Sequence, residues 1–106
     1  MSRLAKLQEF LASDPNDSFT HYALGLEYAK EQNFPEAIRT LEVLRARDPN
    51  YIPTYYMLAG YYKDTGKHET AAAIYSEGIL KARAANDLHA MSELQAALDG
   101  LEDELF

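Results

Sequence analysis

The sequence predicts an all-α protein built from repeated helical pairs. Three observations support this class. A segment of the chain recurs with a 34-residue period, and apolar residues recur at spacings of three and four along most of the 106 positions. Only five glycines and four prolines are present, which leaves little chain for long loops.

The repeat is anchored by a turn signal. Asp14-Pro15-Asn16 recurs as Asp48-Pro49-Asn50. The same 34-residue shift superposes further residues of similar size or polarity: His21 on Tyr55, Tyr22 on Tyr56, Leu24 on Leu58, Gly25 on Ala59, Tyr28 on Tyr62, Ala37 on Ala71 and Leu41 on Tyr75. Because so many positions match, the two segments are predicted to fold alike.

The order within one unit is His21-x2-Leu24-Gly25-x2-Tyr28, then Ala37-x3-Leu41, then Pro49. This pattern resembles the tetratricopeptide repeat, and the resemblance covers residues 18 to about 83. It implies a right-handed α-α superhelix, with two full repeats flanked by an N-terminal half-repeat helix and a C-terminal capping helix. We expect a single domain over 1–106, with parts that follow one another along the chain: an N-terminal helix and turn (1–16), repeat 1 (17–50), repeat 2 (51–85) and the capping helix (86–106).

Local signals place the first two helices. Ser2 can cap a helix whose apolar stripe ends before Asp14-Pro15. The stripe consists of Leu4, Leu7, Phe10 and Leu11. Asp17 can cap a second helix from about 18 to 32, in which Gly25 indicates close contact with a neighbouring helix, since mid-helix glycine costs about 1 kcal/mol.

Proline and glycine mark the next three helices. Pro35 suits the first turn of a helix that ends near Arg47, Pro53 opens another, and Gly66 can end that one in the left-handed conformation. The fifth helix is expected to run to about Ala85, without the proline that the family pattern would place at Arg83. Its expected inward residues are Ala71, Ala72, Tyr75, Ile79 and Leu80.

The last helix is predicted to follow a break and cap at Asn86-Asp87. Its apolar residues recur at spacings of 3, 4, 3 and 4: Met91, Leu94, Leu98, Leu101 and Leu105. We interpret this helix as a cap over the second repeat, because the end of a repeat stack needs an atypical unit. The alternative is a dimer seam, although the pattern spans fewer than three heptads.

Charge is unevenly distributed. Residues 1–86 hold 11 acidic and 10 basic residues, whereas 87–106 hold six acidic residues and no Lys or Arg. Nucleic acid is therefore an unfavourable partner, because phosphate binding needs clustered Lys and Arg. No segment has the ~20 consecutive apolar residues of a membrane span, and the charges at Arg3, Lys6 and Glu9 interrupt any secretory signal, so we expect a cytoplasmic protein without membrane contact.

Catalytic and metal-binding chemistry is not predicted. No nucleophile, phosphate-loop or metalloprotease motif occurs, and the absence of cysteine excludes disulfides and thiolate metal sites. His21, His68 and His89 lack the three- or four-residue spacing of helical metal ligands. We expect no enzymatic activity, no cofactor and no metal.

The resemblance implies that the first helix of each repeat lines a concave groove. The residues that it would place there are Phe19, Tyr22, Leu26, Lys30, Pro53, Tyr56, Gly60 and Lys63. Relatives that clamp the terminal carboxylate of chaperone tails use Lys, Arg and Asn at such positions, and this chain has few of them. Tyr28, Tyr62 and Tyr75 are interpreted as core residues, whereas Tyr22 and Tyr56 repeat at a position that core packing does not require.

The predicted function is a non-enzymatic interaction module or adaptor. An apolar, aromatic-lined groove suits a peptide or amphipathic helix of a partner protein, held by aromatic anchors. The alternative is homo-oligomerisation, with a homodimer pairing through the groove or through the C-terminal helix.

Overall fold

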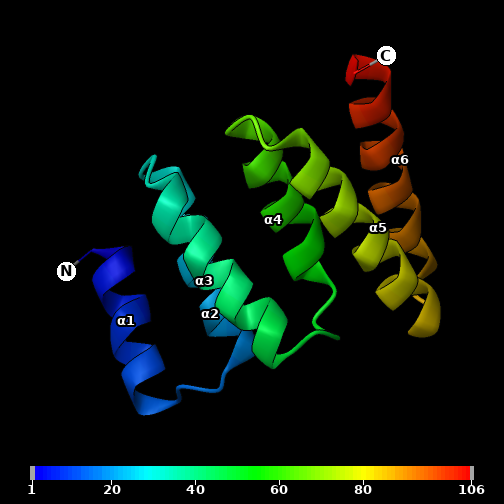
Figure 1. Cartoon of the computed structure of the whole chain (residues 1–106). Helices are drawn as coiled ribbons and strands as arrows, with labels where there is room; N and C mark the ends of the chain where they lie inside the picture. Colours follow the sequence, from blue (N-terminus) through cyan, green and yellow to red (C-terminus); the bar gives the residue numbers. More distant parts are fainter. Residues whose placement is uncertain (1, 106) are drawn as a thin grey trace.

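The computed structural model describes residues 2–105, which form six α-helices and no strand (Figure 1). In chain order these are α1 (Arg3–Ser13), α2 (Ser18–Lys30), α3 (Phe34–Arg47), α4 (Pro53–Asp64), α5 (His68–Ala84) and α6 (Leu88–Leu105). The predicted all-α class is confirmed, and so are most helix ends. Helix α2 ends at Lys30, slightly before the predicted end.

The helix starts use the predicted caps. The side chain of Ser2 accepts a hydrogen bond from the Ala5 amide, and Asp17 accepts one from the Thr20 amide. Asp87 Oδ1 accepts from the Ala90 amide at 3.1 Å, at the start of α6. Each cap satisfies a backbone donor that the first helical turn leaves without an intrahelical partner.

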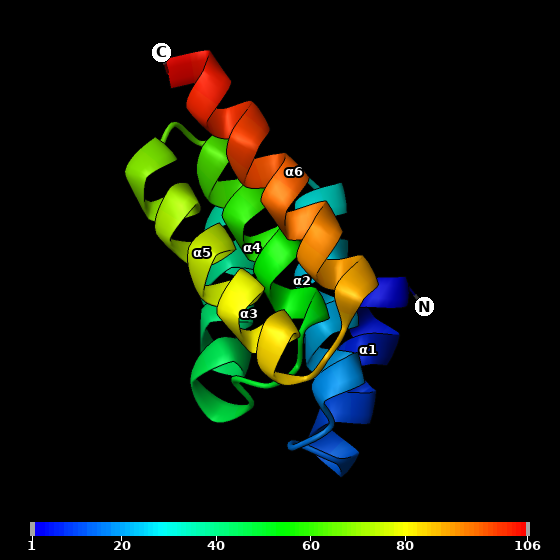
Figure 2. The same cartoon turned by 90° about the vertical axis from the view of Figure 1, so that its right-hand side faces the viewer.

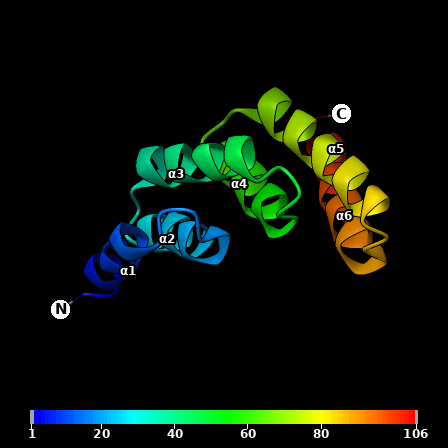
Figure 3. The same cartoon turned by 90° about the horizontal axis from the view of Figure 1, so that it is seen from below.

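The helices stack in chain order into a curved layer. Helix α2 packs against α3, α4 against α5, and α5 against α6, and each pair is joined by a short turn. Seen from below, α3 and α5 form the convex side, whereas α2, α4 and α6 lie toward the concave side (Figure 3). From the C-terminal end, α6 lies beside α5 and in front of α4 (Figure 2). The result is a helical-repeat solenoid.

Equivalent positions of the two repeats fill the core. Ala37 and Ala71, which occupy the same place in successive repeats, are both completely buried. Gly25 allows close contact as predicted: a methyl group there would lie 2.6 Å from Leu41 Cδ2. The buried hydrophobic residues of α6 (Leu94, Leu98 and Leu101) join the core of repeat 2.

One residue of the predicted apolar stripe and one predicted inward residue are exposed instead. Phe10 is 62% exposed and Leu80 is 60% exposed, because each lies on the outer side of its helix. Ile74 and Ala82 of α5 are buried instead. Of the tyrosines predicted to fill the core, Tyr75 is buried, and Tyr28 and Tyr62 are half-buried and pack against the core. The core also includes Tyr55 and Tyr61, which the pattern did not single out.

Candidate functional site

Two hollows lie along the concave side of the helix stack. The first, which we call the α4/α6 groove, has a volume of about 350 Å³. Its lining residues come from the starts of α4 and α6 and from one residue of α2: Tyr22, Ile52, Pro53, Tyr56, Asp87, His89, Ala90, Glu93 and Leu94. The second, the α2/α4 groove, measures about 640 Å³. Its lining residues are Arg3, Phe19, Tyr22, Ala23, Leu26, Glu27, Ala29, Lys30, Phe34, Met57, Tyr61 and Asp64.

Tyr22 lines both grooves and lies at their boundary. Its ring packs against Tyr51, with centroids 5.9 Å apart and a tilted geometry. Burial, and then the nearby Tyr51 hydroxyl, raise the pKa of the Tyr22 phenol. Tyr22 is therefore an uncharged, half-buried aromatic surface held by a second ring.

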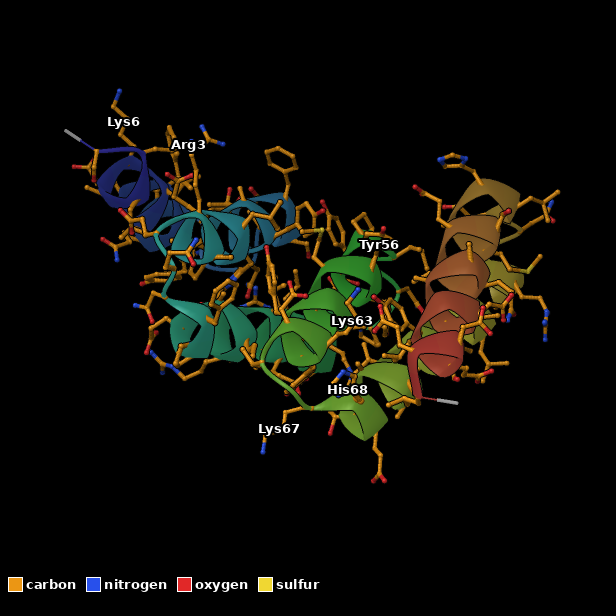
Figure 4. The ribbon with its side chains drawn as sticks, turned by 90° about the horizontal axis from the view of Figure 1, so that it is seen from above. Arg3, Lys6, Tyr56, Lys63, Lys67 and His68 are labelled. Atoms are coloured by element: carbon orange, nitrogen blue, oxygen red, sulfur yellow. The ribbon has the colours of Figure 1, made fainter. Side chains whose placement is uncertain are left out.

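Tyr56 is the most exposed aromatic residue of the α4/α6 groove, with 46% of its surface accessible. The ring meets the buried Tyr75 edge-on, at a centroid distance of 6.3 Å. Figure 4 shows Tyr56 pointing from α4 into the open space on the concave side. One edge of the ring is thus fixed, and the remainder can contact a ligand.

The α2/α4 groove is lined by both aromatic and charged side chains. Phe34 packs edge-on against Tyr61, with ring centroids 5.8 Å apart, and Phe19 is 65% exposed. Arg3 Nε lies 3.4 Å from Glu27 Oε2 and ties α1 to α2. Lys30 lies exposed in the last turn of α2.

The predicted groove residues are divided between these hollows. Phe19, Tyr22, Leu26 and Lys30 line the α2/α4 groove, and Pro53 and Tyr56 join Tyr22 in the α4/α6 groove. Gly60 and Lys63 line neither hollow. A methyl group on Gly60 would lie 4.0 Å from the Tyr75 hydroxyl, so this part of α4 faces α5.

The contribution of α6 to the groove is not predicted from the sequence. One wall of the α4/α6 groove consists of Asp87, His89, Ala90, Glu93 and Leu94, whereas the sequence predicts a cap, or alternatively a dimer seam, for α6. A signal was present, because the 34-residue shift that relates Tyr22 to Tyr56 leads in one further step to Ala90. All three lie in the same groove.

Metal-binding and membrane-spanning features are absent from residues 2–105. No group of three or more His, Asp or Glu side chains in this range is arranged to hold a metal ion. Within the same described part of the chain, every helix is too short or too polar to cross a membrane.

Known structures share this architecture. A tetratricopeptide repeat domain protein from Salinibacter ruber is 38% identical, with a TM-score of 0.82, over 85% of this chain and 91% of that one. The TPR2B domain of yeast Sti1, in complex with pHsp70, has a TM-score of 0.88 at 19% identity, over 95% of this chain and 81% of that one. PcrH, in complex with the chaperone binding region of PopD, also has a TM-score of 0.88, at 14% identity over 97% of this chain and 78% of that one. No protein-family model and no curated protein matches the sequence.

A curved stack of helical hairpins with a hollowed concave side defines the class of helical-repeat solenoids. Within that class, the Salinibacter relative matches in sequence as well as in fold. The chain therefore belongs to the tetratricopeptide repeat family, which confirms the resemblance predicted from its 34-residue period.

Proposed function

We propose that this protein is a protein-interaction module whose concave side binds a peptide or amphipathic helix of a partner. The proposed anchors are Tyr22 and Tyr56, with Phe19 and Leu26 extending the contact into the α2/α4 groove. Lys30 lies at its edge. The observation that carries the proposal is that Tyr22 and Tyr56 occupy the same register in successive repeats and line one groove.

The energetics favour a few aromatic anchors. Binding energy in protein interfaces is concentrated in a small number of Tyr, Trp and Arg side chains. Rings already held on one edge lose little rotational freedom when a ligand packs on the other. Tyr51 holds Tyr22 and Tyr75 holds Tyr56 in this way.

Two solved structures of the same fold support a protein ligand. The Sti1 domain was solved with pHsp70, and PcrH was solved with a segment of PopD. Each has this fold and was solved in complex with another protein or a region of one. We propose a partner of the same general kind, a segment of protein chain, without carrying over either ligand.

A displayed library of random peptides tests the proposal. Peptides selected on the wild type are expected to lose about tenfold or more in affinity on the double variant Tyr22→Ala, Tyr56→Ala. The matched control is Val43→Ala, Leu80→Ala, which removes exposed apolar side chains of α3 and α5 that line neither groove. The control should change affinity less than about twofold.

Two results would contradict the proposal. The first is equal loss in both double variants, with thermal melts showing that both are folded. The second is a wild-type homodimer, found by light scattering, in which Tyr22 and Tyr56 are buried against a second copy. That result would support self-association instead. Most of the apolar stripe of α6 cannot also form a dimer seam, because Leu94, Leu98 and Leu101 are already buried in the core.

A further inference from the structure

The two grooves differ in charge. The α2/α4 groove balances Arg3 and Lys30 against Glu27 and Asp64. The α4/α6 groove contains Asp87 and Glu93, and no Lys or Arg lines it. Among residues 2–105, the other titratable groups that line it are Tyr22, Tyr56 and His89, of which only His89 can become cationic.

Both carboxylates retain capacity for a ligand. The Glu93 side chain is 55% exposed, and its one ion-pair partner in the described chain is His89, whose Nε2 lies 3.2 Å from Glu93 Oε1. His89 is itself 86% exposed and can swing away at little cost. Asp87 Oδ1 accepts the Ala90 amide hydrogen, and a carboxylate can accept several more hydrogen bonds.

The hollow that holds these charges also has apolar lining. Tyr22, Ile52, Pro53, Tyr56 and Ala90 line the same hollow. A ligand that fits it must therefore present apolar and cationic groups close together. An acidic or phosphate-bearing ligand would meet two carboxylates and no fixed positive charge.

We propose that the α4/α6 groove binds a cationic amphipathic segment of a partner protein. An apolar side chain of that segment rests between Tyr22 and Tyr56, and its Lys or Arg side chains pair with Asp87 and Glu93. This inference rests on the proposed function, and it adds the chemistry of the partner. The charge of α6 agrees with it, since residues 87–106 contain six acidic residues and no Lys or Arg.

The test uses two synthetic peptides that differ only in charge. Both carry leucines on one helical face, and the other face is lysine in one peptide and glutamate in its counterpart. Fluorescence anisotropy at physiological salt measures affinity, and amide NMR shifts of Tyr56 and Ala90 locate binding. The lysine peptide is expected to bind at least about tenfold more tightly than the glutamate peptide.

A matched pair of variants separates the groove from overall charge. Asp87→Asn with Glu93→Gln removes two charges from the groove, and asparagine retains the helix cap. Asp99→Asn with Glu102→Gln removes two charges from exposed positions of the same helix that do not line the groove. The groove pair should weaken lysine-peptide binding by about three- to tenfold, and the control pair by less than about twofold.

Three outcomes would overturn the inference: equal affinity for the two peptides, equal loss in the two variants, or no binding of the lysine peptide. The proposed function is judged separately by the unbiased library. If library peptides without Lys or Arg bind the groove and depend on Tyr22 and Tyr56, the function stands and the inference fails. If neither tyrosine matters for any peptide, the function itself fails.

Discussion

Gly78 of α5 lies directly against Tyr55 of α4. A methyl group at position 78 would lie 2.6 Å from Tyr55 Cβ and 3.1 Å from Leu94 Cδ1 of α6. Cβ is fixed to the backbone, so Tyr55 cannot rotate away from such a contact. The missing side chain of Gly78 therefore allows α4, α5 and α6 to meet, and α4 and α6 form the walls of the α4/α6 groove.

Gly78→Ala should destabilise the protein by about 1–3 kcal/mol, because the free-energy cost of overpacking a filled core exceeds the gain in helix propensity from glycine to alanine. The matched control is Gly100→Ala in α6. Position 100 is exposed, and a methyl group there would have no neighbour within 4 Å among residues 2–105, so alanine should stabilise the protein by about 0.5–1 kcal/mol. Urea denaturation followed by circular dichroism measures both. Stabilisation by Gly78→Ala would show that the helices can separate at no cost.

The turn after α2 contains a residue in an unfavourable conformation. Gln32 has φ 64°, and Gly66, at the equivalent position of the next repeat, has φ 87°. Gly66→Ala should cost about 1 kcal/mol, since only glycine adopts positive φ freely. Gln32→Gly should gain up to about 0.5 kcal/mol, because relief of strain is partly offset by the larger entropy of glycine in the unfolded chain. Urea denaturation followed by circular dichroism measures the stability of both variants. A loss of stability in Gln32→Gly would contradict the strain assigned to this turn.

Local features were predictable because their cause is local. Ser2, Asp17 and Asp87 cap helices through contacts three residues away, so the sequence alone shows both partners. Gly25 was predicted to mark close helix contact because no local reason favours glycine within a helix. The 34-residue period then supplied the fold, since each repeat must bury its apolar face against the next.

The rotation of each helix was harder to predict. Tyr55 and Tyr56 are adjacent in sequence, yet Tyr55 is completely buried and Tyr56 is 46% exposed. Successive side chains point about 100° apart around a helix, so the rotation of α4 against α5 decides which of the two is buried. The wall supplied by α6 was missed for the same reason, since Ala90 and Glu93 reach the groove only through the packing of α6 against α4 and α5.

Stability should fall at high pH. Burial raises the pKa of Tyr55, Tyr61 and Tyr62 to about 12, and Tyr62 also donates a hydrogen bond to Glu42. The ordinary value is about 10. The unfolded chain therefore releases these protons first, and the stability that they contribute is complete below about pH 10 and is lost as the pH rises toward 12.

Denaturation at a series of alkaline pH values, with tyrosinate absorbance recorded in parallel, measures this loss. Tyr62→Phe should show a smaller decrease between pH 10 and 12 than the wild type, although it starts from a lower stability. A free energy of unfolding that stays constant between pH 10 and 12 would contradict the raised pKa of these tyrosines.

The C-terminal helix should be essential for a packed structure. A chain that ends after Asn86 loses Leu94, Leu98 and Leu101, which are at most 9% exposed and cover the core of repeat 2. Each buried leucine contributes about 1.5–3 kcal/mol, so their sum approaches the ~5–15 kcal/mol of a typical domain. We expect an insoluble or molten product, detected by dye binding and by loss of near-ultraviolet circular dichroism. Leu105→Ala is the control, because Leu105 is 47% exposed and its loss should cost no more than about 0.5 kcal/mol. A soluble truncated chain that unfolds cooperatively would refute the capping role, since repeat 2 would then be stable with its apolar face in water.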